Sequence, residues 1–207
     1  MTEPIDNRVF VLILQHPQEH RETLSTAPLV CRTLRNTKLV VGLSWPGLTR
    51  AAGDTAEPRR WAVLHLGAAR AAIAEPRELS VLDRQGAAID DPGSILRELH
   101  GIVLLDGTWS QAKTLWWRNP WLLKLHRIVL YPPHPARFGR LRREPRREAL
   151  STIEAAALAL RHLESGPESA NALLTALDTM LATARPRAAA PASRARRTAP
   201  GRRRTAP

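Results

Sequence analysis

The sequence predicts an α/β protein with a mostly parallel sheet flanked by helices. Short runs rich in Val, Ile and Leu recur along the 207 residues, and their length is typical of strands buried on both faces. Helical patterns follow most of these runs, and few hairpin signals separate them, which favours parallel connections. The last stretch consists mainly of Ala, Pro and Arg and cannot bury a core. We therefore expect one domain at 1–184 and a disordered basic tail at 185–207.

The expected elements alternate along the chain as such a sheet requires. Strands are predicted at 9–14, 38–42, 61–66, 102–105 and 127–131. Helices are predicted at 27–35, 95–99, from 108 up to Pro120, at 150–165 and at 170–184. Three connections are expected between them: a Gly- and Pro-rich loop at 44–60, a strand-to-helix junction at 67–74 and a polar connection at 84–93.

Segment 101–113 carries the strongest functional signal. Its apolar run ends abruptly at Asp106-Gly107, a turn pair, and Thr108 is placed to cap the helix that follows. A carboxylate at the carboxyl end of a buried strand, beside a helix N-terminus, lies where open α/β sheets bind ligands. The structural alternative is that Asp106 only caps the helix.

Charge and cysteine content narrow the classes of function. The formal net charge is +12 with a pI near 11.4, which favours a polyanionic partner such as RNA. Eight arginines from Arg185 onwards carry most of this charge and leave +4 for residues 1–184. The single cysteine, Cys31, excludes an internal disulfide and a multi-cysteine zinc site, so no metal is expected. No signal-peptide pattern or apolar run of bilayer length occurs, so we expect a cytoplasmic protein without membrane association.

Two further segments combine basic residues with aromatic or capping residues. Arg118 lies among three tryptophans, Trp116, Trp117 and Trp121, and such a composition is typical of surfaces that stack bases. Trp116 and Trp121 fit core packing better, and Trp117 is the best candidate for exposure. Residues 137–147 contain six arginines, which favours phosphate contact over a merely solvated loop. A capping-box pattern, Ser151-x-x-Glu154, then opens a helix.

Three separated motifs resemble those of DTW-domain proteins, the tRNA-uridine aminocarboxypropyltransferases, which are similar to the knotted SPOUT class of S-adenosylmethionine enzymes. The matching residues are Asp106-Gly107-Thr108-Trp109 with Ala112 and Asn119-Pro120; Gln15-His16-Pro17-Gln18-Glu19; and Arg140, Arg142, Ser151, Thr152, Glu154 and Ala155. The chain departs from the family pattern at Ser25 and Ala27, which flank the matching Thr26, and at Gly139, where relatives often have Tyr. It also has no cysteine-rich segment of the kind with which many relatives begin.

The resemblance implies transfer of the 3-amino-3-carboxypropyl group of S-adenosylmethionine to a ring nitrogen of uridine in tRNA, with release of methylthioadenosine. Asp106 is the candidate catalytic residue, as a base for the uridine imide proton or as a group that orients the donor. Trp109 packs on the donor or acceptor, or anchors its helix to the sheet. Donor contacts are expected from Leu105, Gly107, Thr108, Trp109, Ser151, Thr152 and Glu154, and RNA contacts from Gln15, His16, Arg118, Arg140, Arg142 and Arg143.

Several alternatives stay open at the level of sequence. A methyltransferase acting on RNA would share the fold, the donor and the partner. A non-enzymatic RNA-binding module would use the arginine-rich tail alone and give Asp106 a structural role. Ala and Leu positions at 150–165 and 170–184 offer a face for a homodimer. The sequence also leaves open whether the chain threads the C-terminal trefoil knot of the SPOUT class.

Overall fold

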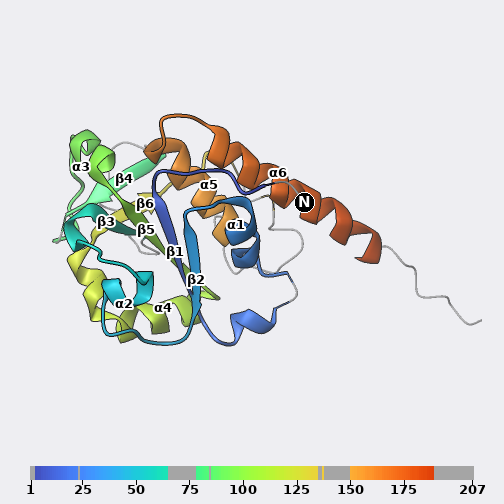
Figure 1. Ribbon diagram of the computed structural model, residues 1–207, viewed down its shortest axis with the longest axis horizontal. Helices are drawn as coiled ribbons and strands as arrows, with labels where there is room; N and C mark the ends of the chain where they lie inside the picture. Colours follow the sequence, from blue (N-terminus) through green and yellow to red (C-terminus); the bar gives the residue numbers. More distant parts are fainter. Residues whose placement is uncertain are drawn as a thin grey trace, which may run out of the picture.

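A single six-stranded sheet organises the molecule in the computed structural model, which describes residues 3–22, 24–64, 78–83, 85–134, 137 and 150–188 (Figure 1). The strand order across the sheet is β2-β1-β5-β3-β6-β4. The strands are β1 Phe10–Gln15, β2 Thr37–Val41, β3 Trp61–Leu64, β4 Leu79–Leu82, β5 Gly101–Asp106 and β6 His126–Leu130. The predicted α/β class with a mostly parallel sheet is confirmed.

β1 and β5 are adjacent interior strands of the sheet. They pair in parallel over their full length, from Phe10 opposite Gly101 to Gln15 opposite Asp106. Gly101 opens β5 because the Trp61 ring lies against it: a Cβ atom there would approach the ring to 2.7 Å. Among the strands of the described residues, β4 and β6 pair antiparallel and the other strand pairs are parallel.

Helices cover both faces of the sheet and bury a separate apolar core on each (Figure 1). One face carries α1 (Ala27–Thr33), α5 (Thr152–Leu163) and α6 (Glu168–Ala188), which pack on one another. The other face carries α2 (Leu48–Ala52), α4 (Trp109–Arg118) and the 3-10 helix η4 (Pro120–Lys124). Side chains alternate between the faces along β5, so Ile102 and Leu104 join the first core and Val103 and Leu105 the second.

The remaining elements are short. The 3-10 helices η1 (Glu19–Arg21) and η2 (Pro58–Arg60) follow β1 and precede β3, and α3 (Gly93–Glu98) precedes β5. No helix within the described ranges is both long and apolar enough to cross a membrane.

The structure differs from the sequence prediction in three places. The predicted loop at 44–60 is wrong in part, because it contains α2 and η2. β4 was not predicted, since its four residues are interrupted by a serine and lie beside a charged connection. α6 continues to Ala188, past the predicted domain end at 184. The predicted junction at 67–74 and the tail from 189 onwards lie outside the described residues.

Candidate active site at the carboxyl edge of the sheet

A buried carboxylate lies at the carboxyl end of the adjacent strands β1 and β5. Asp106 is the last residue of β5, is 5% exposed, and lies directly opposite Gln15 at the end of β1. The Gln15 Nε2 donates to Asp106 Oδ2 at 2.8 Å, and the Thr152 hydroxyl donates to Oδ1. Strand alternation points Asp106 toward the face covered by α1, α5 and α6, where Thr152 begins α5. Asp106 is therefore held from the neighbouring strand and from a helix N-terminus.

Gln15 is itself fixed by further hydrogen bonds. Its side chain is fully buried, and Nε2 also donates to Ser25 Oγ at 3.1 Å. His20 Nδ1 lies 3.1 Å from Gln15 Oε1. Because a carboxamide oxygen only accepts hydrogen bonds, His20 Nδ1 is the donor in this contact. A chain of polar side chains thus runs from His20 through Gln15 to Asp106.

The start of α5 is tied to its surroundings by Glu154. Its Oε2 accepts hydrogen bonds from the Ser151 N–H at 3.1 Å and from the Ser151 hydroxyl at 2.6 Å, which confirms the predicted capping box. Its Oε1 accepts from the backbone N–H of Arg137 at 2.6 Å. The Ile153 N–H donates to Thr26 Oγ1 at 3.4 Å, linking the starts of α5 and α1. These bonds hold the Thr152 hydroxyl over Asp106.

α4 begins three residues after Asp106 and packs on the other face of the sheet. Thr108 caps α4 as predicted: the Gln111 N–H donates to Thr108 Oγ1 at 3.4 Å, and the Thr108 N–H to Gln111 Oε1 at 2.6 Å. Gly107 adopts φ 151°, and a Cβ there would approach Gln111 Oε1 to 2.8 Å and His16 Cβ to 3.4 Å. The His16 N–H donates to the Asp106 carbonyl at 3.0 Å, so the loops after β1 and β5 are joined.

The other predicted site residues are more dispersed. Leu105 is buried in the core beneath α4, and Trp109 is exposed at the first turn of α4. Arg118 ends that ten-residue helix, about 14 Å along its axis from Trp109. Arg140, Arg142 and Arg143 lie outside the described residues.

Four polar residues near Asp106 were not proposed as site residues from the sequence. Glu19 and Thr26 are buried, and His20 and Ser25 bond Gln15. Glu19 stands in the Gln-His-Pro-x-Glu motif, and Thr26 is the one match to the family pattern in its segment, so both carried a signal. Nothing local distinguished His20 or Ser25, because their importance comes from the contact with Gln15.

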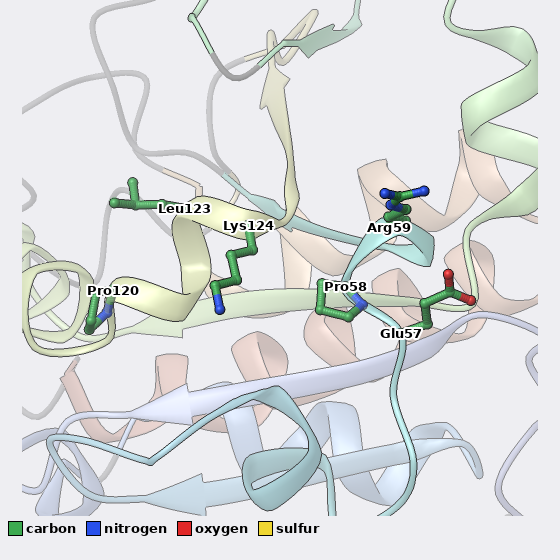
Figure 2. A pocket seen from close by; sticks show the side chains of 6 residues that line it. All are labelled: Glu57, Pro58, Arg59, Pro120, Leu123 and Lys124. Carbon is green, nitrogen blue, oxygen red and sulfur yellow. The ribbon is translucent and has the colours of Figure 1, made fainter.

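A hollow at the opposite edge of the sheet has a different character. Figure 2 shows the Lys124 side chain reaching from η4 into the space between Pro120 and Pro58, with Glu57, Arg59 and Leu123 completing the lining. η4 and η2 precede β6 and β3, so this hollow lies at the amino-terminal ends of the strands. Open α/β sheets bind ligands at the carboxyl ends, and we therefore place the candidate site at Asp106.

Within the described residues, no three His, Cys, Asp or Glu side chains are grouped so that they could hold a metal ion. The side chains of Gln15 and Thr152 contact Asp106 through an amide and a hydroxyl, and such groups suit an organic ligand with charged and hydrogen-bonding groups.

Residues 1–185 match the family model described as the DTW domain. This chain belongs to the DTW-domain family. The match covers the whole described structure except the last three residues of α6, and it includes all the elements that surround Asp106.

Curated relatives of this DTW-domain chain carry one name, tRNA-uridine aminocarboxypropyltransferase 2. The chain is 26% identical to the protein from Macaca fascicularis over 86% of its length, and 28% identical to that from Drosophila melanogaster over 82%. It spans 55% and 62% of those two proteins. The protein from Mus musculus is 27% identical over 78% of the chain, which spans 50% of that relative. No solved structure matches the chain.

Proposed function

We propose that this DTW-domain protein transfers the 3-amino-3-carboxypropyl group of S-adenosylmethionine to a ring nitrogen of uridine in tRNA and releases methylthioadenosine. The names of the curated relatives support the reaction and the substrate. The observation that carries the proposal to particular residues is the buried Asp106 carboxylate, which Gln15 and Thr152 hold at the carboxyl edge of the sheet.

The proposed chemistry needs a fixed carboxylate. The donor is a sulfonium ion, so attack on the carbon next to sulfur expels a neutral thioether. The uridine imide nitrogen becomes a good nucleophile only when its proton leaves, and a carboxylate within hydrogen-bond reach accepts such a proton. Gln15 and Thr152 fix the orientation of the Asp106 carboxylate through hydrogen bonds. In this proposal the fixed carboxylate receives the uridine imide proton or orients the donor amino group.

The residues around Asp106 fit the charges of the donor. Asp106 supplies a negative charge for the cationic end, and the positive end of the α5 helix dipole, at Ser151 and Thr152, favours the donor carboxylate. Glu154 acts in this proposal as a positioning residue, because both of its oxygens already bind the protein. Gln15, which is fully buried, positions Asp106 in the same way.

The wider assignments belong to the same proposal. Family resemblance supports a SPOUT-like fold with a knotted C-terminal region, and tRNA as the partner supports a cytoplasmic location. A homodimer remains a prediction. Three leucines of α6 are not available for a dimer face, because they are buried in the core of the chain: Leu173, Leu177 and Leu181. Arg140, Arg142 and Arg143 stay proposed phosphate contacts on sequence grounds.

The test is mass spectrometry of nucleosides from bulk tRNA incubated with the purified protein and S-adenosylmethionine. Wild type, Asp106→Ala and Asp178→Ala would be compared, since Asp178 is an exposed carboxylate on α6. We expect a uridine that carries the aminocarboxypropyl mass, release of methylthioadenosine, loss of product with Asp106→Ala, and normal product with Asp178→Ala. A methyl increment would identify an RNA methyltransferase instead. A protein that binds tRNA but not S-adenosylmethionine would be a non-enzymatic RNA-binding module.

A further inference from the structure

The exposed face of α4 combines aromatic and basic side chains in one stripe. Trp109, Lys113 and Trp117 are spaced four residues apart and so lie along one side of the helix. Trp117 is 78% exposed and Trp109 is 37% exposed, although both are large apolar residues. The Lys113 Nζ lies 6.0 Å from the centre of the Trp109 ring, so the cation and the ring share this surface. We call these three residues the α4 stripe.

Packing of α4 on the sheet leaves the Trp117 ring exposed. The opposite side of α4 supplies the apolar contacts to the sheet through Ala112 and Leu115, both buried. An exposed tryptophan at Trp117 costs solubility and adds nothing to that core. Large aromatic side chains kept on a surface mark an interaction site.

The charge of the surrounding segment indicates what binds there. From Gly107 to His134 the chain has no acidic residue and carries four basic ones, Lys113, Arg118, Lys124 and Arg127. A surface that is basic and aromatic, with no carboxylate in its segment, complements a polyanion with flat bases. Trp109 and Trp117 are about 12 Å apart along the helix axis, a distance that three or four stacked nucleotides span at about 3.4 Å each.

We propose that the α4 stripe holds a single-stranded segment of the RNA substrate, with bases stacked on Trp117 and Trp109 and a phosphate beside Lys113. The inference rests on the proposed function and identifies where nucleotides flanking the target bind. The stripe begins three residues after Asp106, but Asp106 points to the opposite face of the sheet. The target uridine must therefore leave the stack and turn over the edge of the sheet to reach the carboxylate, as in enzymes that extrude a base.

The test compares full-length variants by fluorescence anisotropy with a short fluorescein-labelled oligouridylate and with labelled bulk tRNA. Titrations at about 50 to 200 mM KCl give both Kd and its salt dependence. Trp117→Leu keeps an apolar side chain but removes the ring, and Trp117→Tyr keeps a ring. Lys113→Gln removes the charge, and Arg161→Gln removes an exposed charge from α5 on the other face as a control. Because Trp117 is mostly exposed, its replacement leaves no cavity.

Stacking and charge give different signatures. We expect Trp117→Leu to raise Kd on the order of 10-fold with an unchanged salt slope, and Trp117→Tyr to recover most of the loss. Lys113→Gln should lower the magnitude of the salt slope by about 0.7, while Arg161→Gln leaves Kd within about 2-fold. If Trp117→Leu binds the RNA as tightly as wild type, the inference is overturned, and the α4 stripe would instead be a contact surface for a protein partner. If the wild-type protein modifies no uridine, the proposed function fails, but the binding series still decides whether the α4 stripe holds RNA. If the wild-type protein is active and all variants bind RNA equally, only the inference about the α4 stripe fails.

Discussion

The hydrogen bond from Thr152 to Asp106 can be measured through the substitution Thr152→Val. Valine matches threonine in shape, so the change removes the hydroxyl from a largely buried carboxylate and leaves the packing at the start of α5 in place. A hydrogen bond to a charged group contributes about 1.5–3 kcal/mol to stability. For a chain of this size each kcal/mol shifts Tm by about 2–4 °C, so we expect Tm to fall by roughly 3–12 °C.

A double-mutant cycle separates this bond from other effects of the substitution. Thr152→Val is measured by thermal and urea unfolding in wild type and in the Asp106→Ala background. Without the carboxylate the hydroxyl has lost its acceptor, so the cost of Thr152→Val should fall to about 0.5 kcal/mol or less. Thr152→Ser should restore most of the stability, because it returns the donor. Thr175→Val is the matched control: its hydroxyl lies on the exposed side of α6 and donates only to the Asn171 carbonyl.

The same cycle carries a functional expectation. If the Thr152 hydroxyl holds the carboxylate during transfer, the loss of about 1.5–3 kcal/mol lowers kcat/KM for tRNA modification by about 10- to 160-fold. Thr152→Ser should retain most of the activity. An equal cost of Thr152→Val in both backgrounds, or full activity of the valine variant, would refute the view that this bond positions Asp106.

Three other substitutions or reactions test particular contacts. Asn119→Ala removes a fully buried side chain that accepts a hydrogen bond from the Trp45 N–H at 2.9 Å and donates to two carbonyls. We expect the free energy of unfolding in urea to fall by about 2–5 kcal/mol, and a fall below about 1 kcal/mol would contradict these hydrogen bonds. Gly107→Ala forces a side chain into φ 151° and against Gln111, so α4 should lose its cap and Tm should fall by several degrees; an unchanged Tm would show that the turn adapts. Burial raises the pKa of the Cys31 thiol, so less thiolate exists at a given pH and iodoacetamide should alkylate Cys31 more slowly than free cysteine at pH 8; an equal rate would indicate an exposed thiol.

The position of Asp106 could be predicted because every part of the signal is local. An apolar run, a turn pair and a capping threonine stand next to one another in the sequence, and each has a direct physical meaning. The exposure of Trp117 followed as well, from helical spacing alone. α2 and β4 could not be found in this way, because five and four residues are too short to establish a period.

The partners of Asp106 were harder to predict because they depend on the assembled sheet. Gln15 meets Asp106 only because β1 and β5 pair with those residues in register, 91 positions apart in the chain. A shift of one residue would turn one of the two side chains to the other face and break the contact. Thr152 reaches the same carboxylate after a 21-residue connection from the end of β6, and no local pattern determines where such a connection places the next helix. Gln15, Asp106 and Thr152, one residue from each of the three separated motifs, are thus joined by hydrogen bonds in space.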